Sequence, residues 1–458
     1  MAFSVADRNV TVVGGGRSGI AAAELLVSRG ARVTLAEAAP SMDGSDALAR
    51  MGVTMALGPH RDDQFLAADL LVLSPGVPPD QEPIRAARRA GVPVIGEVEL
   101  ASRWLRGRVI AITGTKGKST TTTLAARILQ EGGFHAPAGG NLGHALSRQV
   151  DVSRPDSLHV VEVSSFQLEG TDAFHPWIAV FLNLSPDHLD RHPSFDDYAA
   201  AKARIFANQT PDDWAVVNAD DGGAMALAGH GRARRFDFGF DAGLRDGVTV
   251  DGDAIVRRDR GAAAALLPLA SVHLPGRHLL SDVLAATAVG CLAGVAPAAM
   301  QRAVDGFRGL EHALERVGDV HGVSFVNDSK ATNIASARKA IESFDRGLVV
   351  IMGGRFKGGR FEDLREPLST RGRGVIAIGE AAPLILEALQ DVVPVQRAAT
   401  MADAVRLGYA AAQPDGTVLL APACSSFDMF RDYADRGRAF KDAVERLNRE
   451  QSSVWEQR

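Results

Sequence analysis

Apolar runs and helical patterns alternate along the first part of the chain. The run VTVVGGG at 10–16 predicts a buried strand that ends in a glycine turn, and SGIAAAELLVSRG at 18–30 predicts a helix closed by glycine. Further strands are predicted at 31–38 and at 69–78, where the sequence turns at Pro-Gly. Alternation of this kind predicts a parallel sheet joined by helical crossovers.

Two more segments repeat this alternation. In the second, apolar runs at 108–115, 159–168 and 176–188 predict strands, and the periodic stretch 196–209 predicts a helix. In the third, which starts near 310, four spaced apolar runs predict strands at 322–329, 347–354, 373–380 and 416–423. The chain is therefore expected to have an α/β fold.

The sequence changes character between 229 and 275. Short apolar stretches alternate there with Gly-Asp turns and a mixture of Arg and Asp, as in GLRDGVTVDGDAIVRRDR at 243–260. Strand patterns separated by tight turns predict exposed antiparallel strands. A helical pattern resumes at 278–294.

Composition and charge narrow the function classes. The 458 residues are 46% apolar and 23% charged, which is typical of a globular protein of several domains. The net charge of −5 provides no basic field for nucleic acid or an anionic membrane, and no apolar run has the length of a membrane span. The start MAFSVADRNV lacks the pattern of a signal peptide, and two cysteines fit a reducing compartment. We expect a cytoplasmic enzyme or binding protein that binds neither nucleic acid nor membrane.

Lysine is rare in this sequence. Among 50 basic residues, lysine occurs only at 116, 118, 202, 330, 339, 357 and 441. A bias that replaces Lys by Arg leaves lysine where a compact charge, able to lose its proton, is needed. Most of these lysines lie in the motifs described next, although chance is an alternative explanation.

The turn GGGRSG at 14–19 matches G-x-G-x-x-G between a predicted strand and a predicted helix. Backbone N–H groups at such a helix start can hold a diphosphate. Glu37 ends the next predicted strand, where a dinucleotide-binding fold places a ribose-binding acid. The motif does not distinguish NAD from a UDP-sugar, because both present a diphosphate, and a turn that serves packing alone is the alternative.

The turn GTKGKST at 114–120 is a more specific signal. Gly114 and Gly117 allow the backbone to wrap around oxyanions, Lys118 places a point charge at the β- and γ-phosphates, and Ser119 offers a hydroxyl to Mg²⁺. The usual P-loop has four residues between its glycines, whereas this turn has two. Phosphate binding is predicted, because a purely structural turn does not need Gly, Lys and Ser together.

Other polar residues lie near the ends of predicted strands. Glu162 lies in an apolar run, where an unpaired acid is costly to bury and where a carboxylate can hold Mg²⁺. His188, in DHLDRH at 187–192, follows another strand, either as a metal ligand or as a structural histidine. Lys202 lies in the middle of a predicted helix and by itself indicates only surface charge.

Three turns of the third segment carry similar chemistry. NDSKATN at 327–333, GGRFKGG at 353–359 and CSSFDMFRDYADRG at 424–437 all lie at the ends of predicted strands. Each is ambiguous alone. Because open α/β sheets bind ligands at the carboxyl ends of their strands, the three turns together favour a ligand crevice.

Taken together, these motifs resemble those of the Mur ligases, the ATP-dependent amide-forming enzymes of peptidoglycan synthesis. The resemblance covers essentially the whole chain. G-T-x-G-K-S/T is the ATP signature of that superfamily, which includes the folylpolyglutamate synthases, and it explains the short glycine spacing. NDSKATN resembles the glutamate-adding members. The remaining matches are SPGVP (74–78), GGNLG (139–143), LEHALE (310–315), GGRFKGG and APACSSFDMFRDYADRG (421–437).

The resemblance implies an α/β protein of three domains. These would be a Rossmann-like UDP-sugar-binding domain at 1–97, a central P-loop ATPase-like domain at 98–309 and a Rossmann-like amino-acid-binding domain at 310–458. The central domain would combine a parallel sheet with a small antiparallel sheet. The implied activity is ATP-dependent addition of D-glutamate to UDP-N-acetylmuramoyl-L-alanine through an acyl phosphate, by a monomer that uses two Mg²⁺ ions.

The resemblance also implies roles for individual residues. The catalytic residues would be Lys118, His188, Lys202 and Lys330. The metal ligands would be Ser119, Glu162, His188 and Lys202, with Lys202 carboxylated by CO₂. ATP would contact Gly114, Thr115, Lys116, Gly117, Lys118, Ser119, Thr120 and Asp328. The UDP-linked substrate would contact Gly14, Gly16, Ser18, Gly19, Glu37, Gly76 and Asn141. Glutamate would contact Thr332, Lys357, Ser426 and Tyr433.

Some positions depart from the family pattern. Leu279 and Asp282 stand where the family often has asparagines that help to hold adenine, and Ala313 stands where it has an arginine expected to touch ATP phosphate. Arg316 could replace this arginine only if it reached the ATP phosphate from a different position in the chain. The family pattern on the side of the site that would bind uracil is also matched only weakly, because Ala38 and Ala39 follow Glu37.

Four alternatives remain open from the sequence. The ligase could add L-glutamate, or the chain could be a non-catalytic nucleotide-binding relative, which would explain the departures. An NAD-dependent oxidoreductase would explain GGGRSG but leaves GTKGKST and NDSKATN without a role. A folylpolyglutamate synthase would lack the GGGRSG domain at the front.

Overall fold

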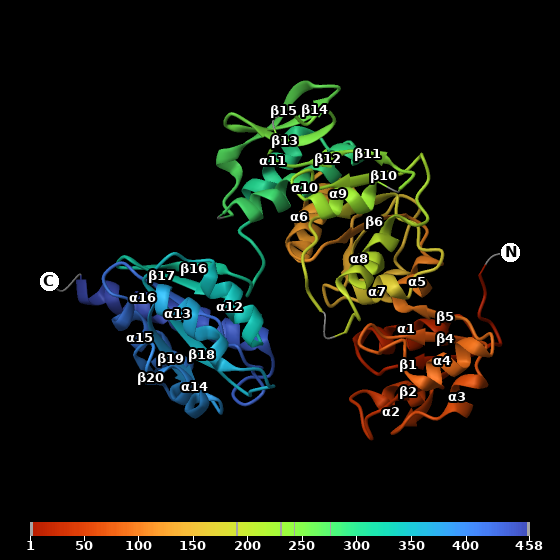
Figure 1. The fold of residues 1–458 in the computed structure, drawn as a ribbon, viewed down its shortest axis with the longest axis horizontal. Helices are drawn as coiled ribbons and strands as arrows, with labels where there is room; N and C mark the ends of the chain where they lie inside the picture. The colour runs from red at the N-terminus through yellow and green to blue at the C-terminus, as the bar shows by residue number, and fades with distance from the viewer. Residues whose placement is uncertain (1–2, 189–190, 230, 242, 275, 456–458) are drawn as a thin grey trace. The chain divides into compact units, whose positions relative to one another are not determined.

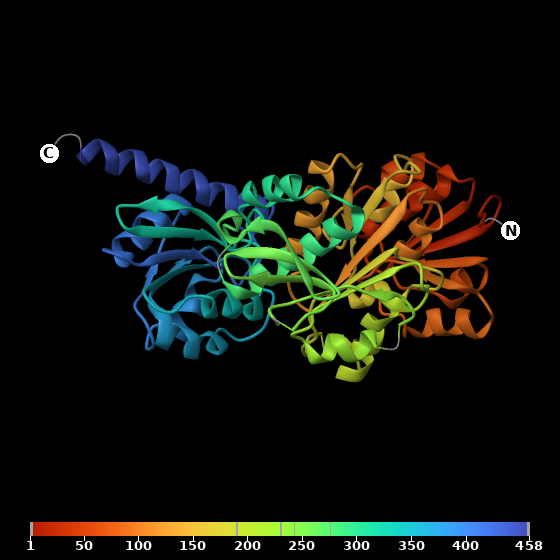
Figure 2. The same ribbon diagram turned by 90° about the horizontal axis from the view of Figure 1, so that it is seen from above.

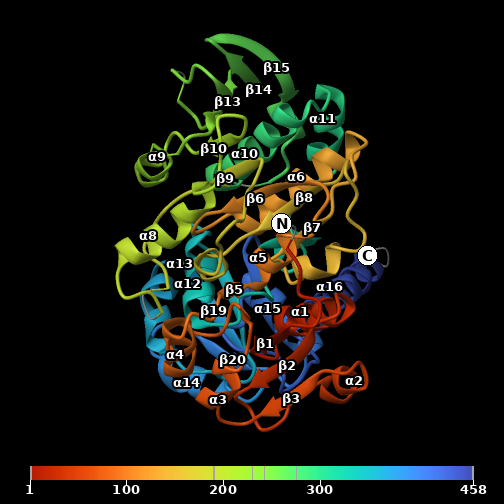
Figure 3. The ribbon, with the colours of Figure 1, turned by 90° about the vertical axis from the view of Figure 1, so that its right-hand side faces the viewer.

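The computed structural model describes residues 3–188, 191–229, 231–241, 243–274 and 276–455. The chain divides into two compact units, residues 1–307 and 308–458 (Figure 1). The first unit contains three sheets and the second unit contains one. Within the first unit, the sheet that contains β6 lies between the sheet of β1 to β5 and the small sheet of β13 to β15 (Figures 1 and 3).

The first sheet is parallel throughout, in the order β3-β2-β1-β4-β5. Its strands are β1 (Asn9–Val13), β2 (Arg32–Glu37), β3 (Thr54–Leu57), β4 (Leu70–Leu73) and β5 (Val94–Gly96). The helices of this region are α1 (Arg17–Ser28), α2 (Ser45–Arg50), α3 (Asp62–Leu66), α4 (Glu82–Arg89) and α5 (Glu97–Ser102). The strand order reverses between β1 and β4, so the turns after these two strands border a crevice.

The second sheet is also parallel, in the order β11-β10-β9-β6-β8-β7. Its strands are β6 (Arg108–Thr113), β7 (Ala138–Gly140), β8 (Leu158–Glu162), β9 (Ile178–Phe181), β10 (Trp214–Val217) and β11 (Arg234–Arg235). Its helices are α6 (Lys118–Glu131), α7 (Ser165–Glu169), α8 (Phe195–Ala203) and α9 (Gly222–Ala228). Because β6 lies between β8 and β9, the segments that follow these three strands meet at one edge of the sheet.

The third sheet confirms the predicted change of pattern after residue 229. Its strands are β12 (Asp237–Phe238), β13 (Gly247–Asp251), β14 (Ala254–Asp259) and β15 (Ala262–Pro268). The pairs β13–β14 and β14–β15 are antiparallel, while the short β12 pairs parallel with β13. Residues 230, 242 and 275 of this stretch lie outside the described residues. Helices α10 (Arg277–Ala293) and α11 (Pro297–Asp305) follow, and both pack against α6.

The sheet of the second unit has the order β16-β17-β21-β18-β19-β20. Its strands are β16 (Glu315–Val320), β17 (Val323–Asn327), β18 (Leu348–Gly353), β19 (Gly372–Ile378), β20 (Val395–Arg397) and β21 (Thr417–Leu420). All pairs are parallel except the antiparallel β16–β17 pair. The helices are α12 (Ile334–Glu342), α13 (Arg365–Arg371), α14 (Ala382–Leu389), α15 (Met401–Ala412) and the long α16 (Tyr433–Trp455), which is best seen in Figure 2.

Two predicted elements differ from those in the structure. The apolar run at 159–168 ends as a strand at Glu162, because Ser164 starts helix α7 there. The Ser164 hydroxyl accepts a hydrogen bond from Gln167 N, and the Gln167 side chain accepts one from Ser164 N, which makes a capping box. The helix predicted at 196–209 is α8, which ends at Ala203 and is followed by a short 3-10 turn over Arg204–Phe206.

Candidate active site

The turn GTKGKST joins β6 to α6 and is held both by bonds within the turn and by residues of other segments. Gly114 and Gly117 have φ angles of +154° and +83°, which L side chains rarely adopt. Lys118 Nζ donates hydrogen bonds to the carbonyl oxygens of Gly114, at 2.9 Å, and Thr115, at 3.0 Å. Asn183 Oδ1 accepts from the amides of Thr115 and Lys116. The turn therefore presents glycine amides, a lysine and the start of a 14-residue helix, an arrangement that can bind phosphate.

Two predicted residues have intermediate exposure at the start of α6. Ser119 and Thr120 are both half-buried, directly after Lys118. A hydroxyl at this position can coordinate a cation that is bound to phosphates. Lys116, by contrast, is exposed at the outside of the turn.

Glu162 ends β8 and is only 2% exposed. Its Oε1 accepts a hydrogen bond from Asn141 Nδ2 at 2.6 Å, whereas its Oε2 is buried without a hydrogen-bond partner among the described residues. A buried carboxylate oxygen without a partner is costly, and a cation would satisfy it. The residues thus fit a Mg²⁺ ion, although no group of three or more His, Cys, Asp or Glu in the described parts of the chain forms a ready-made metal cluster.

Lys202, which the sequence alone places on a helix surface, is 1% exposed. Its Nζ donates to Gly114 O at 2.8 Å, contacts Thr113 Oγ1 at 3.4 Å and lies 4.9 Å from the centre of the Tyr198 ring. Burial and the charge of Lys118 lower the pKa of the Lys202 amine to about 7, against the opposing charges of Asp187 and Glu162. A substantial fraction of this amine is therefore neutral near pH 7 and can act as a nucleophile.

His188 follows β9 and is exposed, with a φ angle of +54°. Its ring lies 5.0 Å from that of Phe166 and 6.5 Å from that of Tyr198, between centroids. The neighbouring positions 189 and 190 of the DHLDRH run lie outside the described residues. The ring packing brings His188 to the same carboxyl edge as Tyr198, which is hydrogen-bonded to Thr115 of the phosphate turn.

His192 is a residue that the sequence analysis missed. It is 2% exposed, with Nε2 2.9 Å from Ser165 Oγ and Nδ1 3.4 Å from Glu169 Oε1. Its ring stacks on Phe166. His192 thus connects the segment after β9 to helix α7, and its place one turn after His188 was the available signal.

The predicted UDP-substrate residues line one cleft of about 580 Å³. The cleft brings the GGGRSG turn after β1, the SPGVP turn after β4 and the GGNLG segment after β7 together. The predicted residues in its lining are Gly14, Gly16, Ser18, Glu37, Gly76 and Asn141. Gly19 does not line it and has a packing role, because a Cβ there would overlap the carbonyl of Gly14. Arg17, His60, Gln81 and Gln167 line the cleft as well and were not predicted.

Glu37 is already bound within the turn. Its Oε2 accepts from Gly15 N at 2.7 Å, its Oε1 accepts from Ala39 N at 3.0 Å, and these hydrogen bonds lower the pKa of its carboxyl group. A carboxylate at the Gly15 amide adds negative charge where a diphosphate would lie in a dinucleotide fold. Arg17 offers a positive charge in the same lining, and an arginine inside the glycine motif was its sequence signal.

Asp282, one of the departures from the family pattern, touches the phosphate turn. A Cβ on Gly117 would overlap the carboxyl group of Asp282, and Asp282 is 5% exposed. Burial raises the pKa of the Asp282 carboxyl to about 8. This acid is therefore mostly neutral at pH 7. In its neutral form it resembles an asparagine in both shape and charge.

The second unit brings the three predicted turns of its sheet together. Asp328 is buried, its Oδ1 accepts from Leu314 N at 3.3 Å, and burial raises the pKa of its carboxyl to about 6. Lys330 is exposed, and its amide donates to His312 O. Two hydrogen bonds between the backbones of Arg355 and Ser425 join GGRFKGG to CSSF. Among the residues predicted to bind the substrate glutamate, Ser426 is buried, Thr332 is half-buried, and Lys357 and Tyr433 are exposed.

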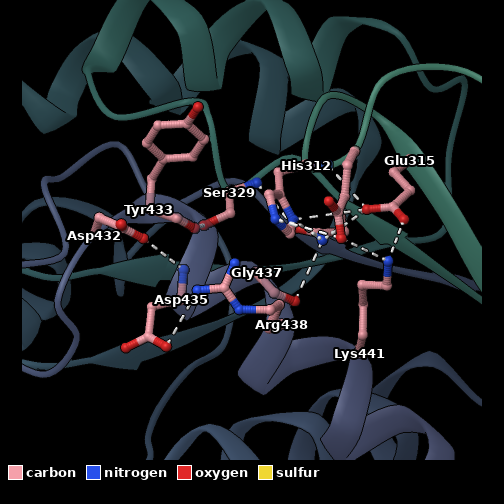
Figure 4. A network of polar contacts seen from close by, with 11 residues as sticks. His312, Glu315, Ser329, Asp432, Tyr433, Asp435, Gly437, Arg438 and Lys441 are labelled. Carbon is pink, nitrogen blue, oxygen red and sulfur yellow. Dashed lines mark hydrogen bonds and ion pairs between the residues drawn. The ribbon is translucent and has the colours of Figure 1, made fainter. Parts of the chain in front are cut away.

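Figure 4 shows a polar network beside these turns. His312 is 3% exposed with a φ angle of +64°, and its Nδ1 lies 2.9 Å from Asn327 Nδ2. Glu315 accepts hydrogen bonds from His312 N, Asn327 Nδ2 and Lys441 Nζ. This network fixes the backbone on both sides of Ala313, the position where the sequence resemblance implies an arginine.

A second cavity, of about 620 Å³, lies elsewhere. Its lining includes Arg108 and Val109 at the start of β6, Trp177 before β9 and Asp213 before β10. It is therefore at the amino ends of the strands, away from the phosphate turn. Because α/β sheets bind ligands at the carboxyl ends, we place the candidate site at the phosphate turn and the 580 Å³ cleft.

Comparisons with known proteins agree with this arrangement. The description "Mur ligase MurD-like, N-terminal domain" matches residues 8–96, "Mur ligase middle domain" matches 112–290, and "Mur ligase, glutamate ligase domain" matches 314–424. The chain belongs to the Mur ligase family.

Two relatives of this Mur ligase resemble it over nearly the whole chain. The UDP-N-acetylmuramoylalanine--D-glutamate ligase of Acidobacterium capsulatum is 46% identical, over 98% of each chain. The ligase of the same name from Koribacter versatilis is 43% identical, over 97% of this chain and 99% of the relative. The solved UDP-N-acetylmuramate-alanine ligase of Thermotoga maritima shares the fold, with a TM-score of 0.56 at 19% identity, over 97% of this chain and 100% of that one.

Family membership confirms two predictions. The fold class is α/β with parallel sheets, and the chain is an ATP-dependent ligase of the amide-bond-forming class. Within the described residues, no helix combines the length and the apolar character needed to cross a bilayer.

Proposed function

We propose that this Mur ligase adds D-glutamate to UDP-N-acetylmuramoyl-L-alanine in peptidoglycan synthesis. The observation that carries the proposal is the near full-length similarity to ligases of that name, at 46% and 43% identity. The structure supports it through the convergence of a phosphate turn, a buried acid and a buried lysine at one sheet edge. We also propose three domains, at 1–97, 98–309 and 310–458, for the UDP-linked substrate, ATP and the amino acid.

The proposed reaction has two steps. The alanyl carboxylate of the substrate attacks the γ-phosphate of ATP, so that a new C–O–P link forms and ADP leaves. The amine of glutamate then attacks the acyl carbon, phosphate leaves, and the amine loses a proton. Because a free carboxylate is a poor electrophile, the first step provides the leaving group that the second step needs.

We assign the phosphate site to Gly114, Thr115, Lys116, Gly117, Lys118, Ser119 and Thr120. Lys118 would stabilise the charge that builds up on the transferred phosphoryl group, and its two hydrogen bonds within the turn preorganise it. Lys330 and Asp328 are proposed to face the phosphates of ATP as well. Ala313 removes a further cation, so Lys118 and Lys330 would carry the stabilisation in this chain.

The proposed metal ligands are Ser119, Glu162, His188 and a carboxylated Lys202. Two bound Mg²⁺ ions would neutralise the phosphate oxygens and polarise the γ-phosphoryl group. The unsatisfied Oε2 of Glu162 supports a cation here, and the lowered pKa of Lys202 supplies the neutral amine that reacts with CO₂. In that reaction the amine nitrogen forms a bond to the carbon of CO₂ and loses a proton, which leaves a carbamate anion.

The substrate residues follow from the cleft and the turns. Gly14, Gly16, Ser18, Glu37, Gly76 and Asn141 would bind the UDP-linked substrate, with Gly19 shaping the turn. Thr332, Lys357, Ser426 and Tyr433 would surround glutamate, with Lys357 neutralising its side-chain carboxylate. A cytoplasmic location and a monomeric state are also proposed. Free Cys291 and Cys424 are compatible with a reducing compartment, and light scattering of the purified chain tests the monomer.

The deciding experiment is phosphate release from ATP with UDP-N-acetylmuramoyl-L-alanine as acceptor. D-glutamate, L-glutamate, lysine and meso-diaminopimelate are compared as the amine. Release with D-glutamate alone is expected. Equal or greater release with L-glutamate would make the chain an L-glutamate ligase, and no release with any amine would indicate a non-catalytic relative.

A further inference from the structure

Among the described residues of this Mur ligase, Arg436 is the largest side chain that is almost completely buried, with 1% of its surface exposed. It lies in the first turn of α16. Its Nε donates to Ser329 Oγ at 3.0 Å, its Nη2 donates to Ser329 O at 2.9 Å, and its Nη1 donates to Cys424 O at 3.1 Å. An arginine fork in which each of the three nitrogens donates a hydrogen bond fixes the atoms around it.

The three turns of the second unit all contact this guanidinium. Ser329 belongs to NDSKATN, and Cys424 begins CSSFDMFRDYADRG, the motif whose helical end contains Arg436 itself. Gly354 of GGRFKGG passes so close that a Cβ on it would lie 3.3 Å from Arg436 Nη1. One side chain therefore touches every turn to which glutamate binding is assigned, although Arg436 belongs to none of the assigned positions.

The charge of Arg436 has no carboxylate hydrogen-bonded to it among the described residues, because its acceptors are two carbonyls and a hydroxyl. Asp428 is near enough to act on it electrostatically but is not hydrogen-bonded to it: Asp428 Oδ2 accepts from Glu380 N, and Oδ1 is buried without a partner among the described residues. Burial lowers the pKa of the guanidinium only to about 10, so it stays charged at neutral pH. A buried cation of this kind is costly until an anion approaches it.

The rest of the first turn of α16 supports the same segment. The Ser329 hydroxyl donates to Tyr433 O at 2.7 Å, and Asn327 Nδ2 contacts Gly437 O at 3.4 Å. Gly437 packs so tightly on the ring of His312 that a Cβ would overlap it (Figure 4). The helix start thus contacts the residues on both sides of Asp328.

We propose that Arg436 is a positioning residue of the amino-acid site, which holds the three turns together and whose buried charge favours the carboxylates of the incoming amino acid. The inference rests on the proposed function, because it assumes that the three turns bind glutamate. It adds Arg436, with a positioning role, to the residues already proposed to contact glutamate.

The test compares Michaelis constants in the full-length chain. Arg436→Gln removes the charge, and Arg436→Lys keeps the charge but loses the fork. Arg438→Gln is the matched control, because Arg438 lies on the same helix, is 48% exposed and has Asp435 as its one ion-pair partner among the described residues, although its charge also acts on Glu311 and His312. We expect Arg436→Gln to raise KM for D-glutamate about tenfold or more, with KM for ATP and the UDP-linked substrate within about twofold, and Arg436→Lys to have an intermediate effect.

Each outcome decides the proposal. A lower melting temperature with three unchanged Michaelis constants, or an equal rise in all three, would make Arg436 a purely structural residue. If Arg436→Gln does not fold, Arg436→Lys and Ser329→Ala take its place, and a rise that is selective for glutamate is again required. A wild-type chain that releases no phosphate with D-glutamate overturns the proposed function and this inference together, whereas an active wild type with unselective variants overturns only the inference.

Discussion

The phosphate turn of the first unit and the three turns of the second unit are stabilised in different ways. Lys118 bonds to carbonyls three and four residues before it, so this lysine is held within one short segment, although Asn183 and Lys202, which are 67 and 88 residues from their partners, also support the turn. Ser329, by contrast, bonds to Arg436, which is 107 residues away, and Asn327 bonds to Gly437, 110 residues away. The lysine of the first turn is thus positioned by its own segment, whereas the amino-acid turns depend on a distant helix.

The largest effect is expected in the phosphate turn. Lys118→Ala removes the cation of the phosphate turn, and we expect kcat to fall on the order of 10²–10³-fold, as for the loss of one transition-state donor. Phosphate release under saturating substrates measures it. Lys339→Ala, on the exposed part of α12, is the control and should retain activity. Normal turnover in Lys118→Ala would remove this turn from the chemistry.

The next largest effect is expected from a substitution of Lys202, the buried lysine at the same sheet edge, which tests whether this lysine is carboxylated. Lys202→Arg keeps a positive charge but cannot form the carbamate, so activity is expected to fall by about 10² or more. With ¹³C-labelled bicarbonate, the wild type should show a carbamate carbon signal by NMR that Lys202→Arg lacks. If the two spectra are the same, the proposal that Lys202 is carboxylated is wrong.

Asp282 gives a pH-dependent effect of intermediate size. Its carboxyl ionises near pH 4 in the unfolded chain but at about pH 8 in the folded chain, so the folded state keeps a proton that the unfolded state loses across this range. The contribution of Asp282 to wild-type stability should therefore fall as the pH rises from 4 to 8, and the melting temperature of Asp282→Asn relative to wild type should rise over the same interval.

The same ionisation should affect nucleotide binding. At pH 9, about one unit above this pKa, only about a tenth of the carboxyl is neutral, and repulsion of phosphate at Gly117 should raise KM for ATP up to about tenfold. Asp282→Asn should lack this rise. Parallel pH profiles of KM in the two proteins would show that Asp282 does not ionise in this range.

The smallest effect is expected at the edge of the network in Figure 4. Lys441 contacts Glu311 at 3.1 Å and Glu315 at 2.7 Å, and its side chain is 30% exposed. Because partly exposed ion pairs are weak, Lys441→Met should lower the free energy of unfolding by about 1 kcal/mol. Urea denaturation measures this change. A loss as large as that from Arg436→Gln would mean that the outer ion pairs, and not the buried arginine, hold the turns.

Local patterns predicted much of the fold and part of the site. The strands that end at GTKGKST, NDSKATN and GGRFKGG were found because apolar runs and glycine turns are determined by neighbouring residues. The capping box at Ser164 was missed, since the run at 159–168 looks continuous by hydrophobicity alone. His192 and Arg17 were missed as well, because neither stands out from its motif until the structure shows its contacts.

The sequence by itself determined the family, the α/β fold class and the turns that carry glycine, lysine and hydroxyl groups, because these depend on residue types at short spacing. Only the tertiary structure decided that Lys202 is buried, that burial beside Gly117 raises the pKa of the Asp282 carboxyl and that Arg436 joins three turns. Burial and electrostatic environment depend on which distant segments pack together. No local spacing encodes them.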